Sequence, residues 1–284
     1  MILKKILLSI LALSAVVVTL LHSRVSASIN DEYLQIHFID VGQADAILII
    51  TPDQETILID AGTTAGGRTV VNYLNHLNIE TIDHVIATHP HADHIQGFPV
   101  IFENFEVRNV YAPRVSHTTV AYRNFLTAVQ NQGLTIKTAV AGLELPIDGI
   151  DAVFVGPTRA YAASALNNWS AILHVTHDEQ SFIFTGDVER AGELDMVNMY
   201  GDDLQSNVLK VSHHGSNTST IQEFLNVVQP QIAVISVGRN SYGHPTPQVL
   251  DRLENMGTHI YRTDMNGTVI IISDGINLTV ETER

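Results

Sequence analysis

A short run of metal-binding side chain types constrains this chain more than any other feature. Residues 88–94 read THPHADH, with three histidines and one aspartate. The preceding residues, 82–88, read IDHVIAT and favour a strand. Imidazole and carboxylate groups are good ligands for zinc and manganese. The sequence therefore predicts a metal site at the end of a strand, and the alternative is a polar loop that is rich in histidine by chance.

Three further apolar runs end in the same residue types. The run SFIFT leads to Asp187, the run VLKVS leads to His213 and His214, and His244 follows the run VISVG. Strand ends meet at one edge of a sheet, which is where sites in α/β proteins form. Core packing does not explain histidine or aspartate at four separate strand ends, so we expect these side chains to meet.

Predicted strands and helices alternate along most of the sequence. Runs rich in β-branched residues predict strands at 34–41, 44–51, 56–60, 82–88, 171–176, 181–185, 208–212, 232–237, 267–272 and near Leu278. Helical spacing of apolar residues predicts helices within 70–77, 120–129, 189–199, 221–228 and 249–256. Two packed mixed sheets with helices on both outer faces accommodate this order, which predicts an α+β fold, an αββα four-layer sandwich.

Composition restricts the class of protein. Of the 284 residues, 45% are hydrophobic and 16% are charged, which is enough for a full core and excludes a disordered chain. The formal net charge is −15, so the surface as a whole repels nucleic acid, and a polyanionic substrate requires local cations. Cysteine is absent, which excludes disulfide bonds and thiolate metal ligands.

The N-terminus has the pattern of an export signal. Two lysines precede an almost unbroken apolar run over residues 6–21, and small residues follow it. This pattern predicts a signal peptide over residues 1–27, cleaved after Ala27, and one domain over residues 28–284. We expect a secreted, extracellular protein with no stable membrane insertion after cleavage. The alternative is an uncleaved anchor, although the run is shorter than the ~20 residues of a spanning helix.

These motifs resemble those of the metallo-β-lactamase superfamily, and more narrowly the hydrolase domain of ComEC-type DNA-uptake proteins. They extend over nearly all of the chain that follows the predicted signal peptide. The matching segments are FIDVGQADA (38–46), LIDAG (58–62), HPHADH (89–94), TGD (185–187), LKVSHHGS (209–216) and YGHP (242–245). The resemblance implies the metallo-β-lactamase fold and a metal-dependent hydrolase.

The resemblance also implies that six side chains bind two divalent metal ions, Zn²⁺ or Mn²⁺. They are His89 and His91 on the first ion, Asp93, His94 and His244 on the second, and Asp187 between the two.

Further residues are expected to support these ligands. Asp60 would accept a hydrogen bond from the histidine cluster, as ligating histidines usually require, although a turn aspartate after a strand is the alternative. Asp40 and Asp45 fit a structural role better than a catalytic one. Many superfamily members carry a histidine before the Thr-Gly-Asp segment, but this chain has none there. We therefore expect either a weakly held first ion or an ion completed by Asn168.

The same residues suggest a mechanism. Two cations about 3.5–4 Å apart lower the pKa of a shared water and give hydroxide at working pH. Asp93 would hold the proton of this water, and either His213 or His214 would protonate the leaving oxygen. The backbone N–H groups of Gly215 and Ser216, at an expected helix start, would bind a phosphate oxygen.

We therefore expect a secreted phosphodiesterase that acts as a nuclease on extracellular DNA or RNA. One alternative is a hydrolase of another exported phosphodiester, such as a phosphocholine ester on a wall polymer. Another is a non-catalytic accessory module for DNA uptake. Hydrolysis of β-lactams is a poorer option, because the best-known zinc lactamases carry cysteine where Asp187 stands. The sequence does not determine the native metal, the cleavage polarity or the oligomeric state.

Overall fold

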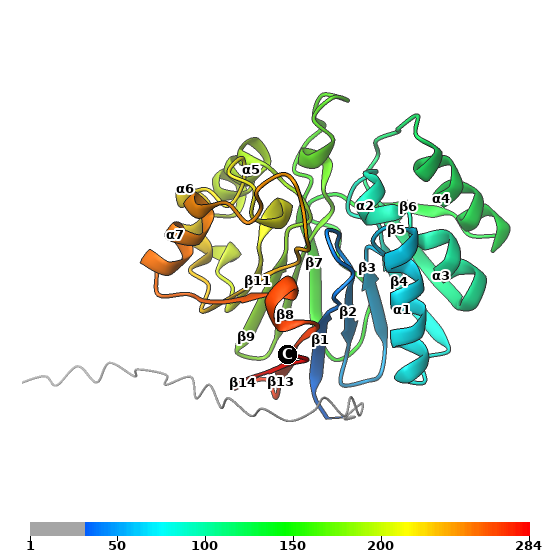
Figure 1. Cartoon of the computed structure of the whole chain (residues 1–284), viewed down its shortest axis with the longest axis horizontal. Coiled ribbons are helices and arrows are strands. Elements are labelled where there is room, and N and C mark those ends of the chain that lie inside the picture. Colours follow the sequence, from blue (N-terminus) through cyan, green and yellow to red (C-terminus); the bar gives the residue numbers. More distant parts are fainter. Residues whose placement is uncertain (1–31) are drawn as a thin grey trace, which may run out of the picture.

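The computed structural model describes residues 32–284, which form two β-sheets packed face to face with helices on both outer faces (Figure 1). The predicted α+β, αββα four-layer sandwich is confirmed. The predicted signal peptide lies outside the described residues. Within residues 32–284, no helix is both long enough and apolar enough to span a bilayer.

The first sheet has eight strands in the order β14-β13-β1-β2-β3-β4-β5-β6. Its strands are β1 (Leu34–Phe38), β2 (Ile47–Ile50), β3 (Thr56–Ile59), β4 (Thr81–Ile86), β5 (Glu106–Ala112), β6 (Ile136–Thr138), β13 (Val269–Ser273) and β14 (Leu278–Thr282). Pairing is antiparallel from β14 to β3 and parallel from β3 to β6. A parallel pair needs a crossover connection, and helices supply each one. They are α1 (Thr64–His76), α2 (Ala92–Ile95), α3 (Phe98–Asn104) and α4 (Val120–Asn131).

The second sheet has six strands in the order β12-β11-β10-β9-β8-β7. Its strands are β7 (Asp151–Gly156), β8 (Ile172–His177), β9 (Gln180–Phe184), β10 (Val208–Lys210), β11 (Ile232–Ile235) and β12 (His259–Arg262). Strands β8 and β9, both expected from the sequence, form an antiparallel hairpin, and β9 to β12 run parallel. The predicted strand–helix units are confirmed. Their helices are α5 (Arg190–Tyr200), α6 (Gln222–Val228) and α7 (Pro247–Asn255), and α8 (Thr263–Asn266) follows β12.

Both faces of the central strands are buried, which explains their continuous apolar sequences. Strand β2 reads ILII. Its Ile47 and Ile49 pack into the core between the sheets, whereas Leu48 and Ile50 pack into the core beneath α1, α3 and α4. Successive side chains point to opposite faces of a strand, so a single strand serves two cores. A third core lies between the second sheet and α5, α6 and α7.

Parallel strands bring their carboxyl ends to one edge of the sandwich. Ile59 of β3 pairs with Ile86 of β4 in the first sheet, and Phe184 of β9 pairs with Lys210 of β10 in the second. Each of these four residues is at or next to the end of its strand. The polar motifs that follow the strands are therefore held close together by the registers of the two sheets.

His37 of β1 gives the fold a measurable dependence on acid. Its side chain is buried, and its Nδ1 lies 2.8 Å from the Tyr73 hydroxyl on α1. Burial lowers the pKa of His37 from 6.5 to about 3. The unfolded chain therefore binds a proton that the folded chain excludes, and stability is lost as the pH falls from 6.5 toward 3.

We predict that His37→Gln reduces this acid sensitivity. Between pH 6.5 and pH 5, the free energy of unfolding of the wild type should fall by about 2 kcal/mol more than that of the variant, at ~1.4 kcal/mol per pH unit. Denaturant unfolding at a series of pH values measures this difference. His76→Gln, at an exposed position of α1, is the control and should retain the wild-type slope. Equal slopes for wild type and His37→Gln would contradict the prediction.

Candidate metal centre

The loop after β4 and the short helix α2 hold the first histidines of the site. His89 is buried and His91 is half-buried, and His89 Nε2 lies 2.9 Å from His91 Nδ1. The ring centroids of His89 and His94 are 4.2 Å apart. The three histidines predicted from the sequence therefore form one cluster, with His91 nearest to solvent.

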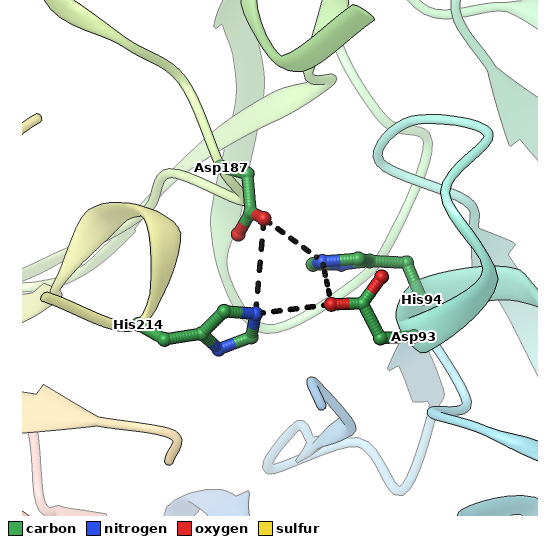
Figure 2. A group of neighbouring side chains, drawn as sticks. All are labelled: Asp93, His94, Asp187 and His214. Atoms are coloured by element: carbon green, nitrogen blue, oxygen red, sulfur yellow. Dashed lines mark hydrogen bonds and ion pairs between the residues drawn. The ribbon is translucent and has the colours of Figure 1, made fainter. Parts of the chain in front are cut away.

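Four side chains from three separate elements point toward one another (Figure 2). One nitrogen or oxygen atom from each lies within 4.8 Å of the others, and the four residues are Asp93, His94, Asp187 and His214. Asp187 Oδ2 lies 3.2 Å from His94 Nε2 and 3.7 Å from His214 Nε2. Asp93 Oδ2 lies 3.4 Å from His214 Nε2. The predicted meeting of strand ends from both sheets is thus present.

The predicted residues of the first ion lie beside this group. His89 Nε2 is 3.9 Å from Asp187 Oδ2, so His89, His91 and Asp187 form a second, adjoining cluster. The expected ligands of two neighbouring ions are therefore contiguous. Their metal binding stays a prediction.

His244 lies next to the site but outside the group of four. Its ring is half-buried, with the centroid 5.6 Å from that of His213. The turn that carries it is fixed by the amide of Thr246, which donates to the Gly215 carbonyl oxygen at 2.8 Å. A Cβ at Gly215 would lie 2.6 Å from Pro245 Cβ, so this close approach requires glycine. The structure thus groups His214, and not His244, with Asp93, His94 and Asp187, while the metal binding of His244 stays a prediction.

Geometry separates the two neighbouring histidines that the sequence left ambiguous. His214 is buried, and its Nδ1 donates to the Ser236 carbonyl oxygen at 2.8 Å, which turns Nε2 toward Asp93 and Asp187. The side chain of His213 is 24% exposed. Its Nε2 lies 3.8 Å from Asp187 Oδ2. His214 therefore faces the two carboxylates of the centre, whereas His213 lies nearer to solvent.

Asp60 makes the contact that the sequence analysis expected of it. It is fully buried, and its Oδ2 lies 2.7 Å from His94 Nδ1. The Thr88 hydroxyl also donates to Oδ2 at 2.6 Å, and the Thr88 amide donates to Oδ1 at 2.8 Å. Asp60 thereby fixes the ring of His94 and directs its Nε2 toward Asp187.

The centre suits a cation. Burial alone would lower the pKa of His94, but the carboxylates of Asp187, Asp60 and Asp93 outweigh burial and raise it well above its ordinary value. The pocket thus strongly favours positive charge. His94 Nε2 is buried and makes no hydrogen bond within the described residues. Imidazole nitrogens and carboxylate oxygens are the donor set of zinc and manganese sites, so the residues present fit a divalent metal ion.

The structure gives Asn168 a role other than the predicted completion of the first metal site. Its Oδ1 accepts hydrogen bonds from the amides of Glu189 at 3.2 Å and Gly192 at 3.0 Å. Asn168 therefore caps the first turn of α5. Nearby Ser170, which the sequence analysis did not single out, accepts a hydrogen bond from the Asp187 amide at 3.1 Å and fixes the backbone of that ligand.

The predicted helix start at Gly215 and Ser216 is wrong. Residues Ser212–Gly215 form a 3₁₀ turn in which His213 and His214 have φ values of 50° and 53°, and α6 begins only at Gln222. The Ser216 amide donates to the His213 carbonyl oxygen at 2.9 Å. This amide is thus committed within the turn, and no helix N-terminus lies there to bind a phosphate.

A four-layer αββα sandwich with imidazole and carboxylate groups gathered at one edge is the architecture of the metallo-β-lactamase class of metalloproteins. The chain belongs to the Metallo-beta-lactamase superfamily, whose sequence profile matches residues 39–239.

Relatives among known proteins confirm the narrower resemblance to competence proteins. ComE operon protein 3 of Bacillus subtilis (strain 168) is 31% identical over 253 residues, which cover 83% of this chain and 32% of that protein. Competence protein ComA of Neisseria gonorrhoeae is 32% identical over 232 residues, which cover 81% of this chain and 31% of that protein. The chain thus spans about a third of the length of these relatives.

Solved structures confirm the fold. The metallo hydrolase Igni18 of the archaeon Ignicoccus hospitalis superposes with a TM-score of 0.56 at 15% identity, over 83% of this chain and 98% of that one. The metallo-beta-lactamase fold protein YhfI of Bacillus subtilis superposes with a TM-score of 0.54 at 10% identity, over 82% of this chain and 98% of that one. At such identities the likeness concerns the fold alone.

We predict that Asp60→Asn weakens metal binding. Losing the partner of a ligating histidine typically costs 10–100-fold in metal affinity, so the dissociation constant for Zn²⁺ or Mn²⁺ should rise by about that factor. Chelator competition measures it. Asp83→Asn is the matched control, because Asp83 is also a buried aspartate of this sheet, bonded to Thr56 away from the site. Equal affinities for the two variants would refute the role of Asp60.

Proposed function

We propose that this protein is an exported phosphodiesterase that uses two divalent metal ions to cleave nucleic acid. The observation that carries the proposal is the group of Asp93, His94, Asp187 and His214, with the partly exposed His213 beside it. Export rests on the signal peptide predicted for residues 1–27. One relative is named a competence protein, and together with the resemblance to ComEC-type DNA-uptake proteins this supports a role with DNA.

Six side chains would hold the metal ions, Zn²⁺ or Mn²⁺. They are His89 and His91 for the first, Asp93, His94 and His214 for the second, and Asp187 for both, with His244 adjoining. When bound, the ions supply a water of lowered pKa and neutralise charge on the phosphodiester.

The protein side chains would move the protons. Burial would raise the pKa of Asp93, but His94 and His214 hold it below its usual range, so Asp93 stays ionised and can accept a hydrogen bond from the attacking water. His213 reaches toward solvent, and its Nδ1 lies 3.8 Å from the Glu189 carboxylate. Glu189 would orient the ring, and His213 would protonate the leaving oxygen.

Tyr242 supports nucleic acid as the substrate. Its ring is 74% exposed and stacks on His244 at a centroid distance of 5.7 Å and an interplanar angle of 29°. An exposed aromatic ring beside a phosphodiester site is suited to stack on a base. Such contacts are local, so they operate despite the net charge of −15.

A phosphocholine ester of a wall polymer is the second candidate substrate. The acidic composition favours it, because a cationic choline group is attracted to a negatively charged surface, whereas DNA is repelled.

A substrate panel tests the proposed function. Purified protein loaded with Mn²⁺ or Zn²⁺ should cleave DNA or RNA, single- or double-stranded, and a chromogenic phosphodiester. We predict that His213→Ala lowers kcat by about 10²–10⁴-fold, the usual contribution of a positioned proton donor. Metal content should remain near that of the wild type.

Other results of the substrate panel and of the His213→Ala variant would each favour a different function or role. Hydrolysis of a small phosphodiester or a phosphocholine ester without cleavage of any nucleic acid would defeat the nuclease proposal. Bound metal without any hydrolysis would indicate an accessory module for DNA uptake. Loss of metal from His213→Ala would make His213 a ligand.

We predict that Tyr242→Ala acts on substrate binding. Loss of one stacked base costs ~1–3 kcal/mol, so KM for an oligonucleotide should rise by about 5- to 150-fold while kcat for a small phosphodiester stays unchanged. Tyr242→Phe is the matched control and should retain the wild-type KM. An unchanged KM in Tyr242→Ala would show that the ring does not contact the substrate.

A further inference from the structure

A buried lysine lies directly beneath the metal centre. Lys210 is the last residue of β10 and is fully buried. Its Nζ donates to the Gly186 carbonyl oxygen at 2.9 Å and forms an ion pair with the Asp45 carboxylate. A buried ammonium group is costly unless it is paired and hydrogen-bonded, so these two contacts fix its position.

The two oxygens of Asp187 face different partners. Oδ2 faces the imidazoles of the centre, at 3.2 Å from His94, 3.7 Å from His214, 3.8 Å from His213 and 3.9 Å from His89. Oδ1 lies 3.8 Å from Lys210 Nζ. Oδ1 is also buried and has no hydrogen-bond partner among residues 32–284. One oxygen of the Asp187 carboxylate thus faces the ammonium group of Lys210, and the other faces the imidazole rings.

We propose that Lys210, anchored by Asp45, retains Oδ1 of Asp187 and thereby holds Oδ2 toward the imidazoles that would bind metal. Lys210 is then a positioning residue that acts through Asp187. The inference rests on the metal binding in the proposed function but not on its substrate.

Asp45 also lies close to the imidazole rings of two histidines of the centre. Its Oδ1 lies 3.4 Å from His214 Nδ1, and its Oδ2 lies 3.8 Å from His94 Nδ1. One carboxylate therefore faces Lys210 and the Nδ1 atoms of two histidines whose Nε2 atoms face Asp187. The charges of Lys210 and Asp45 offset each other, so the pair adds little net charge to the centre. Its main effect is to orient the Asp187 carboxylate and the rings of His94 and His214.

A structure of the wild-type protein loaded with Mn²⁺ or Zn²⁺ tests the inference directly. We expect Oδ2 of Asp187 at a metal–oxygen bond length, about 2.0–2.2 Å for zinc, and Oδ1 within hydrogen-bond distance of Lys210 Nζ. A bond between a metal ion and Oδ1 would overturn the proposal. This measurement needs no substrate, so its result is independent of whether nucleic acid is cleaved.

The double variant Asp45→Asn/Lys210→Met provides a second test, because it removes both charges together. Neutral replacement of a buried ion pair is often tolerated, so the metal-free variant should fold, which thermal unfolding checks. Its metal dissociation constant, measured by chelator competition, should rise 10–100-fold. Lys137→Met, at an exposed lysine of β6, is the control and should bind metal as the wild type does.

If the double variant binds metal with wild-type affinity, Lys210 and Asp45 do not position Asp187 and form only a structural ion pair of the core. That result would overturn the proposal. If the variant does not fold, the coordination of Asp187 in the metal-loaded wild type decides the question.

Discussion

The constraint on which the rest of this structure depends is the shared edge at which parallel strands of both sheets end. Strands β3 and β4 end there in the first sheet, and β9 and β10 end there in the second. Each strand is held on two sides by apolar cores, so its last residue is fixed in space, and the polar residue that follows is fixed with it. The centre is therefore positioned by packing that lies outside it, as a preorganised site requires.

Burying several carboxylates at that edge costs free energy unless a cation lies close to them. Asp45, Asp60 and Asp187 are all buried there, and Lys210 is the lysine within ion-pair distance of Asp45 and Asp187. The remaining negative charge raises the pKa of His94 far above its ordinary value, against the effect of burial. A divalent metal ion offsets the same charge without a proton. Metal binding and fold stability at this edge should therefore be coupled, because packing holds the ligands together only in the folded protein and the unfolded chain has no such site.

The sequence predicts those elements whose pattern of apolar residues is local and clear. It does not predict short elements without such a pattern, or which of several partners a polar side chain contacts. Continuous apolar runs such as β2 identified central strands because both faces of those strands are buried. Helix α3 was not expected, because its short sequence FPVIFEN is apolar without clear helical spacing. Asn168 was considered as a metal-site residue, but its oxygen caps α5. The sequence predicts a helix start at Gly215 and Ser216, whereas the left-handed φ values of His213 and His214 fold this segment into a tight turn.

The sequence by itself determined which residue types follow which strands, and hence the four-layer fold, the superfamily and the set of candidate ligands. These follow from local periodicity and from chemistry carried by single residues. Only the tertiary structure decided which atoms meet: that His214 rather than His244 joins Asp93, His94 and Asp187, and that Lys210 faces one oxygen of Asp187. The group of four joins residues that follow strands of both sheets, and Lys210 and Asp187 lie at the ends of neighbouring strands of one sheet. These distances depend on strand register and sheet packing, which no local stretch of the chain encodes.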